Sequence, residues 1–258
     1  MCIAYLALGA HARWPLFIAA NRDEFHARPC SVAQPWTQRP DIIAGLDLQG
    51  GGTWLGVTHA GRYALITNYR EPGHALAHAP SRGRLVSDYL EGAQSPLDYA
   101  RQVHADGTAY NGFNLIVGDR QQACYLSNRA GQAAPVVLPP GRYVLSNHLL
   151  DTPWPKARRL RSALDAFALE GLEASLAPAF DALRDATQAE EHALPNTGLT
   201  PERERLLSSP FIVSPDYGTR CSTLIALGAS GQGLLSELSY DAQGRPVQRH
   251  DWPFRLVG

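Results

Sequence analysis

The chain has 258 residues, of which 45% are hydrophobic and 18% charged, a composition typical of a globular protein rather than a disordered one. Its 23 Lys and Arg residues nearly balance its 24 Asp and Glu residues, which leaves a net charge of -1. This balance argues against the broad positive surface of proteins that bind nucleic acids or anionic lipids. We therefore expect no nucleic-acid partner.

The cysteines and the chain start indicate a cytoplasmic protein. Cys2, Cys30, Cys124 and Cys221 are far apart, and no C-x-x-C motif or zinc-type histidine pair occurs. This spacing predicts reduced thiols rather than a disulfide framework or a metal site. The start lacks the basic region of a signal peptide, and no stretch approaches the roughly 20 apolar residues that span a bilayer. We expect no membrane span, no metal and no resident cofactor.

The first quarter of the chain predicts two pairs of strands. Residues 3–9 and 16–20 are apolar and flank the turn-like GAHARW, a spacing that suits a hairpin. GTWLGVT and RYALITNY form a second pair joined at residues 59–61, with the β-branched and aromatic residues that strands prefer. Between the pairs, QGGGTW lacks the Lys-Ser/Thr of a P-loop, so it predicts a loop with unusual backbone angles close to a ligand.

The middle of the chain alternates loop, helix and strand signals. EPGHALAHAPSRG predicts a loop, followed by helices near Arg84–Glu91 and Pro96–His104. GFNLIVGD and ACYLSN predict a strand pair, and YVLSN predicts a further short strand.

The last third predicts two helices and a final strand pair. DTPWPKARRLRSALDAF predicts the longest helix, because Ala157, Leu160, Leu164 and Phe167 recur at helical spacing. A second helix is expected over residues 176–186, and RCSTLIALG and LLSELSY predict strands on either side of ASGQG. Paired strands interrupted by helical blocks indicate mixed α and β structure dominated by antiparallel sheet. With no repeat or linker, we expect one domain over residues 1–258.

Cys2 has two interpretations. A cysteine in an apolar strand is most often a small core residue. If Met1 is excised, however, Cys2 carries both a thiol and a free α-amine. Their reference pKa values are about 8.5 and about 7.7–8.0, so the amine can accept the thiol proton as the sulfur attacks. A nucleophile and its base would then belong to one residue.

The NRDE stretch, Asn21 to Glu24, is the second candidate. Four polar residues after LFIAA are typical of a solvated strand end, but on a strand Asn21 and Asp23 share one face and Arg22 and Glu24 the other. If this strand pairs with the one that carries Cys2, Arg22 stabilises the thiolate and a carboxylate orients the amine.

Three further residues complete the candidate site. Asn68 and Asn147 end predicted strands, where asparagines either form turns or donate an amide into an oxyanion hole. Arg220 begins a strand and is either a surface residue or a clamp for substrate or thiolate. A shared site requires Asn68, Asn147 and Arg220 to converge around Cys2.

Taken in order, stretches spread over nearly the whole chain resemble the NRDE family, also called the transport and Golgi organisation protein 2 family. The matching stretches are MCIA, ANRDEFHARP, GGGTWLGV, ALITNYREP, SRGRLV, GFNLIVGD, LSNHLLDTPWPK and YGTRCSTLI. The beginning and strand order of this family are similar to those of N-terminal nucleophile cysteine hydrolases such as penicillin V and bile-salt acylases. The resemblance implies an α+β fold, a four-layer αββα sandwich of two stacked antiparallel sheets flanked by helices.

The resemblance also implies roles for individual residues. In the acylases an N-terminal cysteine attacks an amide, an arginine and an aspartate assist, and asparagines supply oxyanion donors. Cys2 matches the nucleophile, Arg22 the arginine, Asn68 and Asn147 the asparagines, and Arg220 a late arginine beside the nucleophile. The acylase aspartate falls at Phe25 here, so Asp23 or Glu24 takes its role only if a bulge re-aims the strand end.

Two functions of different classes follow from the resemblance. One is hydrolysis of a non-peptide or cyclic amide, a small-molecule substrate, through a thioester on Cys2. The other is a non-catalytic binding or trafficking role, because some relatives resemble intracellular haem carriers; the ligand would then be haem as cargo. No C-x-x-C-H motif is present. A retained Met1 would block the α-amine and argue against catalysis.

Overall fold

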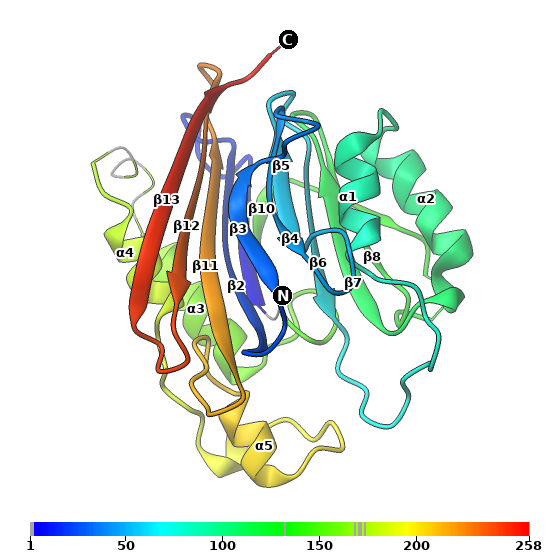
Figure 1. Cartoon of the computed structure of the whole chain (residues 1–258), viewed down its shortest axis with the longest axis vertical. Coiled ribbons are helices and arrows are strands. Elements are labelled where there is room, and N and C mark those ends of the chain that lie inside the picture. Colours follow the sequence, from blue (N-terminus) through cyan, green and yellow to red (C-terminus); the bar gives the residue numbers. More distant parts are fainter. Residues whose placement is uncertain (1–2, 132, 168, 170–171, 173, 258) are drawn as a thin grey trace.

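The computed structural model describes residues 3–131, 133–167, 169, 172 and 174–257. Two antiparallel sheets stack face to face, and helices cover the outer side of each (Figure 1). This arrangement confirms the predicted αββα sandwich. Stacked sheets of this kind bury the inward-facing residues of both sheets in one shared core.

The first sheet has six strands in the order β10-β1-β2-β11-β12-β13. Its members are β1 (Ile3–Leu8), β2 (Leu16–Phe25), β10 (Gly141–Leu145), β11 (Tyr217–Leu227), β12 (Gln232–Tyr240) and β13 (Pro246–Arg255). The predicted hairpins β1–β2 and β11–β12 are both present, and Ile3 lies opposite Asn21. β13 was not predicted, because most of its side chains are exposed, as an edge strand permits.

The second sheet has seven strands, and each pairs with its neighbour along the chain. They are β3 (Cys30–Pro35), β4 (Ile42–Asp47), β5 (Leu55–Thr58), β6 (Tyr63–Asn68), β7 (Phe113–Gly118), β8 (Ala123–Ser127) and β9 (Val136–Leu138). The predicted pairs β5–β6 and β7–β8 are confirmed. The sequence did not predict β3, β4 or β9. β9 has only three residues, and the pairing of β3 with β4 is irregular between Ser31 and Gln34.

The helices cover the sheets in two pairs. α1 (Arg84–Glu91) and α2 (Pro96–Asp106) pack on the second sheet, and α3 (Pro155–Asp165) and α4 (Ala177–Leu183) pack on the first. α2 begins where expected, because Ser95 accepts a hydrogen bond from the Asp98 amide and Pro96 takes the first helical position. α3 has 11 residues, as does α2, so it is not longer than every other helix.

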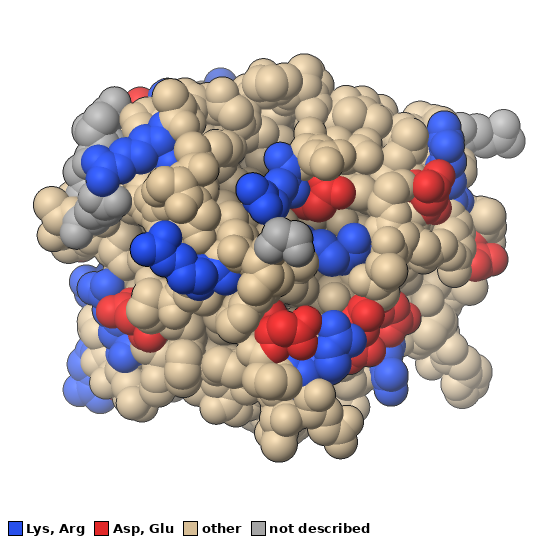
Figure 2. Space-filling model, turned by 90° about the horizontal axis from the view of Figure 1, so that it is seen from above, with Lys and Arg blue, Asp and Glu red and all other residues tan. Residues whose placement is uncertain are grey.

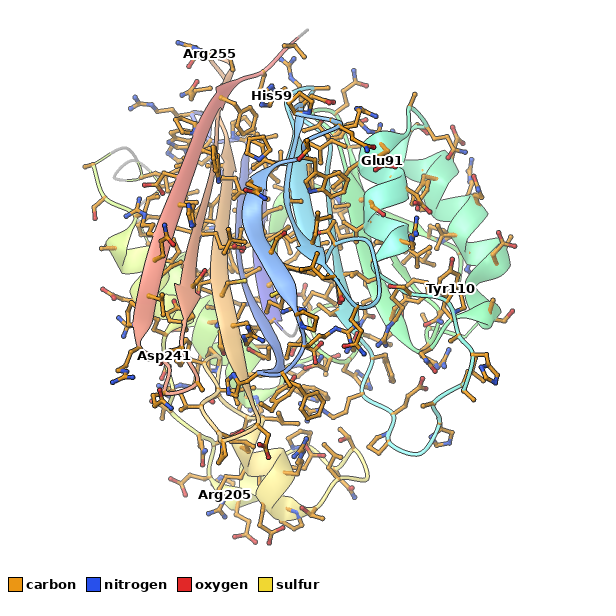
Figure 3. All side chains as sticks on the ribbon, in the orientation of Figure 1. His59, Glu91, Tyr110, Arg205, Asp241 and Arg255 are labelled. Atoms are coloured by element: carbon orange, nitrogen blue, oxygen red, sulfur yellow. The ribbon has the colours of Figure 1, made fainter. Side chains whose placement is uncertain are left out.

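The short helix α5 (Pro201–Leu206) lies at the end of the sandwich where β2 finishes and β11 begins. In Figure 3, Arg205 of α5 is at this end, and His59, in the β5–β6 turn, is at the other. The described residues also form two 3-10 turns, η1 (Gly107–Ala109) and η3 (Glu191–Ala193).

Successive side chains along a strand point to opposite faces of the sheet, so each one packs in one of the layers on either side. On β2, Leu16, Ile18 and Ala20 face the second sheet, whereas Phe17 and Ala19 face the α3–α4 layer.

No helix within the described ranges is long and apolar enough to cross a membrane. Figure 2 shows the His59 end of the molecule, where basic and acidic side chains are interspersed rather than gathered into a field of one sign.

One buried carboxyl group joins the two sheets. Glu237 on β12 is 1% exposed, and it accepts hydrogen bonds from the Ala33 amide on β3 at 2.7 Å and from the Thr223 hydroxyl at 2.9 Å. The Ala33 carbonyl also accepts from the Trp252 indole at 2.8 Å. Burial raises the pKa of Glu237, which favours the neutral acid in the folded protein.

This raised pKa predicts that Glu237→Gln increases the free energy of unfolding, relative to the natural protein, by an amount that grows with pH. Above the ordinary glutamate pKa of about 4.3 the unfolded chain releases a proton that folded Glu237 retains, so the stability of the natural protein falls as pH rises toward the folded pKa. Relative to Glu237→Gln, the free energy of unfolding of the natural protein should decline by up to about 1.4 kcal/mol per pH unit in that window. Urea denaturation at several pH values from 4 to 7 measures this difference.

Glu71→Gln is the control with the opposite sign. Burial raises the pKa of Glu71, but its ion pair with Arg129, at 2.6 Å, outweighs this effect and the pKa is lowered. Its contribution to stability is therefore lost as pH falls. A free-energy difference between the natural protein and Glu237→Gln that stays constant with pH would contradict the prediction.

Candidate active site

The NRDE stretch ends β2 with side chains on two faces of the sheet, as its alternation predicts. Arg22 and Glu24 line a cavity of about 460 Å³, and Asp23 lines a second cavity of about 160 Å³. Asn68, at the end of β6, lines both, so the two cavities adjoin there. Asn21 lines neither and anchors the sheet, because its amide donates to the carbonyls of Leu183 and Pro210.

Arg22 is held in place by groups from the second sheet. Its side chain is 3% exposed, and its guanidinium carbon lies 4.2 Å from the centre of the Trp54 ring. Nη2 is 3.8 Å from Asp47 Oδ2, and Nη1 donates to Cys30 Sγ at 3.5 Å. A buried cation requires such compensation. The guanidinium therefore lines the larger cavity as a fixed positive charge.

Asp47 couples Arg22 to the glycine-rich loop. Its Oδ1 accepts hydrogen bonds from the amides of Gln49 and Gly50, and its Oδ2 accepts from Arg28 Nε at 2.8 Å. Burial raises the pKa of Asp47, but these hydrogen bonds and the positive charge of Arg28 outweigh it and the pKa is lowered. The carboxylate is thus charged at neutral pH.

The QGGGTW loop has the unusual backbone angles that its glycines predict. The φ angles of Gly51 and Gly52 are +70° and +76°. At Gly52 a Cβ atom would lie 2.4 Å from the carbonyl carbon and oxygen of Gly83, so the loop passes directly against the segment before α1. Thr53 then donates from its amide to the Gly83 carbonyl at 3.1 Å.

Asp23 lies on the other face, toward α5. It is 3% exposed, and its Oδ1 accepts a hydrogen bond from the Thr219 hydroxyl at 2.7 Å. The register between β2 and β11 shifts between Thr219 and Cys221, so an irregularity is present, but in β11 rather than in β2. Phe25, at the position of the acylase aspartate, is 51% exposed and packs against Tyr217. Glu24 lies 3.8 Å from Arg28 in the larger cavity.

Asn147 joins Asp23 and Asn68 in the smaller cavity. It is 7% exposed, its Nδ2 donates to the Asn68 carbonyl at 3.0 Å, and its Oδ1 accepts from Lys156 Nζ at 3.1 Å. Lys156 and Arg70 line the same cavity. Arg70 makes a 2.6 Å ion pair with Glu204 of α5 and donates from its amide to the Asn147 carbonyl.

Arg220 is the candidate that the structure leaves outside both cavities. One of its guanidinium nitrogens donates to the carbonyls of Phe25, His26 and Arg28, so it braces the turn between β2 and β3. Of the described candidates, Arg22, Asp23, Asn68 and Asn147 therefore come together, and Arg220 stabilises the backbone beside them. Cys2 lies outside the described residues, and the first described residue is Ile3.

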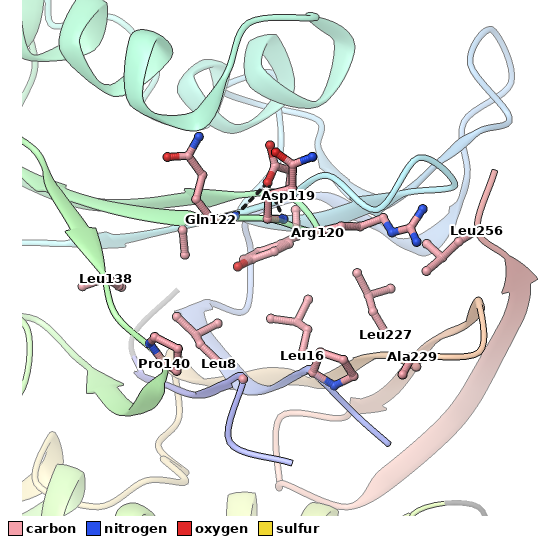
Figure 4. A pocket seen from close by; sticks show the side chains of 16 residues that line it. Leu8, Leu16, Asp119, Arg120, Gln122, Leu138, Pro140, Leu227, Ala229 and Leu256 are labelled. Carbon is pink, nitrogen blue, oxygen red and sulfur yellow. Dashed lines mark hydrogen bonds between the residues drawn. The ribbon is translucent and has the colours of Figure 1, made fainter. Parts of the chain in front are cut away.

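A third cavity, of about 280 Å³, lies at the far end of the sandwich (Figure 4). Leu8, Leu16 and Leu227 line it from the first sheet, and Leu138 lines it from the second. Its lining residues include no serine, threonine, cysteine, lysine or histidine. Because no cysteine lines it, this cavity is not the candidate site for thiol chemistry.

The chemistry of the two adjoining cavities is that of an anion-stabilising site. A fixed guanidinium, a buried ammonium and an asparagine amide can stabilise a negative charge, and the Asp23 carboxylate can hold a cation. Across the described ranges no group of three His, Cys, Asp or Glu side chains could hold a metal ion. The sequence did not indicate Asp47, Trp54 or Lys156, although one signal was available, since Lys156 is the only lysine of the chain.

The close approach of Gly52 to Gly83 predicts a large cost for a methyl group there. Gly52→Ala adds backbone strain of about 1–2 kcal/mol and a clash with main-chain atoms that cannot rotate away. Gly73→Ala is the matched control, because Gly73 has a φ of +81° and nothing within 4 Å of a Cβ position. Urea denaturation should show Gly52→Ala to be less stable than Gly73→Ala by at least about 1 kcal/mol. Equal stabilities would show that the loop tolerates the contact.

Comparisons with known proteins agree with the fold and extend over most of the chain. Residues 1–242 match the family described as Transport and Golgi organisation 2. Transport and Golgi organization protein 2 homologs of Bos taurus and Homo sapiens are each 39% identical over 243 residues, covering 87% of this chain and 86% of theirs. The Drosophila melanogaster Transport and Golgi organization protein 2 is 32% identical over 129 residues, 45% of each chain.

A solved structure shows a similar architecture. A Caenorhabditis elegans N-acylethanolamine-hydrolyzing acid amidase ortholog matches with a TM-score of 0.50 and 12% identity, over 87% of this chain and 92% of that one. At this identity the likeness shows the fold alone, two antiparallel sheets with helices. The sequence matches confirm the resemblance found from the NRDE stretch and its companions: this chain belongs to the transport and Golgi organisation 2 family.

Proposed function

We propose that the protein is an N-terminal nucleophile cysteine hydrolase that cleaves a small-molecule, non-peptide or cyclic amide through a thioester on Cys2. The observation that carries the proposal is the register of β1. Ile3 lies opposite Asn21 of β2, and Ala4 lies opposite Leu145 of β10. One further pair in the β2 ladder and two further pairs in the β10 ladder would set Cys2 beside Arg22 and Asn147, residues that line the adjoining cavities.

The alternation of side chains along β1 also supports Cys2 as the nucleophile. Ala4 and Leu6 face the second sheet, as Arg22 does. Cys2 precedes Ala4 by two residues, so an extended chain start would give its side chain the same face. The thiol would then meet the fixed positive charge of Arg22, which favours the thiolate.

The proposed reaction needs no group beyond the chain and water. The α-amine of Cys2 accepts the thiol proton while the sulfur attacks the amide carbon, and the carbonyl electron pair moves to oxygen. When the carbonyl reforms, the C–N bond breaks and the ammonium gives its proton to the leaving amine. The α-amine then accepts a proton from water as the hydroxyl attacks the thioester. Collapse of the second tetrahedral intermediate breaks the C–S bond, the ammonium returns its proton to the sulfur, and the acid is released.

The remaining residues have distinct roles in this proposal. The Asn147 amide donates to the oxyanion of the tetrahedral intermediate, and Asn68 contributes from the boundary of the two cavities. The Asp23 carboxylate orients the α-amine and stabilises it as ammonium. Arg220 braces the turn that follows the NRDE stretch. The solved structure of similar fold is named as an amidase, and this supports the same class of bond as the substrate.

The first test is the relative reactivity of the thiols. With Met1 removed, Cys2 should be alkylated by iodoacetamide before the other cysteines near neutral pH. Burial raises the pKa of Cys124 to about 11 and that of Cys221 well above the ordinary range, so both thiols should react slowly. Peptide mapping by mass spectrometry, before and after aminopeptidase treatment, identifies the first site. Cys2→Ala should abolish amide turnover with the fold retained, and Cys2→Ser should leave traces of activity.

An early reaction at Cys30, or at Cys2 no faster than in a free cysteine peptide, would count against the hydrolase. The non-catalytic carrier, with a haem-like ligand as cargo, would then be the better interpretation.

The second test addresses the charge of Arg22. Arg22→Met should slow alkylation of Cys2 about tenfold near pH 7, and the difference should disappear at alkaline pH, where the thiol ionises without help. Arg28→Met is the matched control, because Arg28 lines the same cavity but is 29% exposed and pairs with Asp47. It should change the rate less than about twofold. Equal slowing by both substitutions would remove the specific role of Arg22.

A further inference from the structure

The only lysine of the chain is buried in the smaller cavity. Lys156 is 2% exposed and follows Pro155 at the start of α3, and its Nζ donates to Asn147 Oδ1 at 3.1 Å. Burying an ammonium is costly unless its hydrogen bonds are satisfied.

The contacts of Lys156 determine which way the Asn147 amide points. A lysine ammonium can only donate, so the Asn147 atom that faces Nζ must be the side-chain oxygen. The Asn68 carbonyl can only accept, so the Asn147 atom that faces it must be the amide nitrogen. A flipped amide would lose both hydrogen bonds, because its nitrogen would face the Lys156 ammonium and its oxygen would face the Asn68 carbonyl. The orientation is thus set by chemistry. Lys156 is the nearer of two donors to Oδ1, at 3.1 Å, and the Ser146 hydroxyl is the other, at 3.5 Å.

The backbone around Asn147 is fixed by other groups. The Thr67 hydroxyl donates to the Ser146 carbonyl at 2.6 Å, the Arg70 amide donates to the Asn147 carbonyl at 2.7 Å, and the Asn114 amide donates to the His148 carbonyl at 3.0 Å. Rotation of the side-chain amide is therefore the main freedom left at this position. Within the described chain, Nδ2 donates only to Asn68, so its second hydrogen is available to the cavity.

We infer that Lys156 is a positioning residue that locks the Asn147 amide with its second N–H available to the oxyanion of the reaction proposed above. The inference rests on that proposed function and adds the residue that prepares its oxyanion donor. Without Lys156 only the Asn68 carbonyl and the more distant Ser146 hydroxyl oppose a flip. The flipped amide would present its oxygen, which repels the developing negative charge. We therefore expect the Cys2 sulfur to attack carbonyl groups more slowly, while the fraction of Cys2 in the thiolate form stays unchanged.

The test compares two reactions of the same sulfur in the full chain after removal of Met1. Alkylation by iodoacetamide displaces iodide at a saturated carbon and forms no oxyanion. In acylation by p-nitrophenyl acetate the thiolate attacks the carbonyl carbon, the electron pair moves to oxygen, and collapse breaks the C–O bond to release p-nitrophenolate. The initial release of p-nitrophenolate, after subtraction of the rate in Cys2→Ala, measures acylation.

Lys156→Met should lower the acylation rate about tenfold or more and leave the alkylation rate within about twofold. Lys156→Arg, which can still donate to Oδ1, should recover part of the loss. Arg62→Met is the matched control, because Arg62 also donates to backbone carbonyls, those of Tyr89 and Gln94, but packs on Tyr89 outside both cavities. It should leave both rates unchanged.

A double-mutant cycle tests whether Lys156 acts through Asn147. In the Asn147→Ala background, Lys156→Met should lower acylation no further. If Lys156→Met does not fold, the chain with ¹⁵N-labelled lysine offers another measurement, because a single lysine gives a single ammonium signal. Asn147→Ala must shift that signal and speed its exchange with water; an unchanged signal would overturn the inference.

The outcomes separate this inference from the proposed function. If Cys2 is neither alkylated nor acylated preferentially, the hydrolase proposal fails. If Cys2 undergoes both reactions and Lys156→Met changes neither rate, or changes both equally, only the positioning role fails.

Discussion

The register of β2 between β1 and β11 is the constraint on which the site depends. β2 pairs with both neighbours along most of its length, and its side chains alternate between the two faces of the sheet. Its end therefore delivers a cation, Arg22, to one cavity and a carboxylate, Asp23, to the next. A slip of one residue would exchange these charges and disrupt the packing of the strand on both of its faces. The same alternation that buries Ile18 thus sets the polarity of each cavity.

Burial of Arg22 depends on the stacking of the sheets. The guanidinium belongs to the first sheet, whereas Trp54 and Asp47, which stabilise it, belong to the second sheet and its glycine-rich loop. Neither sheet alone could hold this charge away from water. Within the same interface, Glu237 accepts a hydrogen bond from the β3 backbone, and burial raises its pKa. Polar contacts across the interface therefore fix both the relation of the sheets and the geometry of the larger cavity.

Strong local patterns were sufficient to predict most of the fold. The hairpins β1–β2, β5–β6, β7–β8 and β11–β12 were found because apolar strands flank recognisable turns. The helix over Pro155–Asp165 followed from the spacing of Leu160 and Leu164. β13 was missed because an edge strand buries little and so carries little apolar periodicity. β3 was missed because much of its stabilisation comes from Glu237 and Trp252, more than two hundred residues later.

The sequence by itself determined the chemical types at the site and their division between two faces, because side-chain alternation along a strand is a local property. It also identified the family, since the matching stretches occur in order. Only the tertiary structure decided which residues meet. The Asn147 amide donates a hydrogen bond to the carbonyl of Asn68, which lies 79 residues earlier in the sequence. Arg220, in contrast, donates to backbone carbonyls. Lys156 carries no local signal that distinguishes it from a surface lysine. Its burial against Asn147 arises from the packing of α3 on the sheet, which no short stretch of sequence encodes.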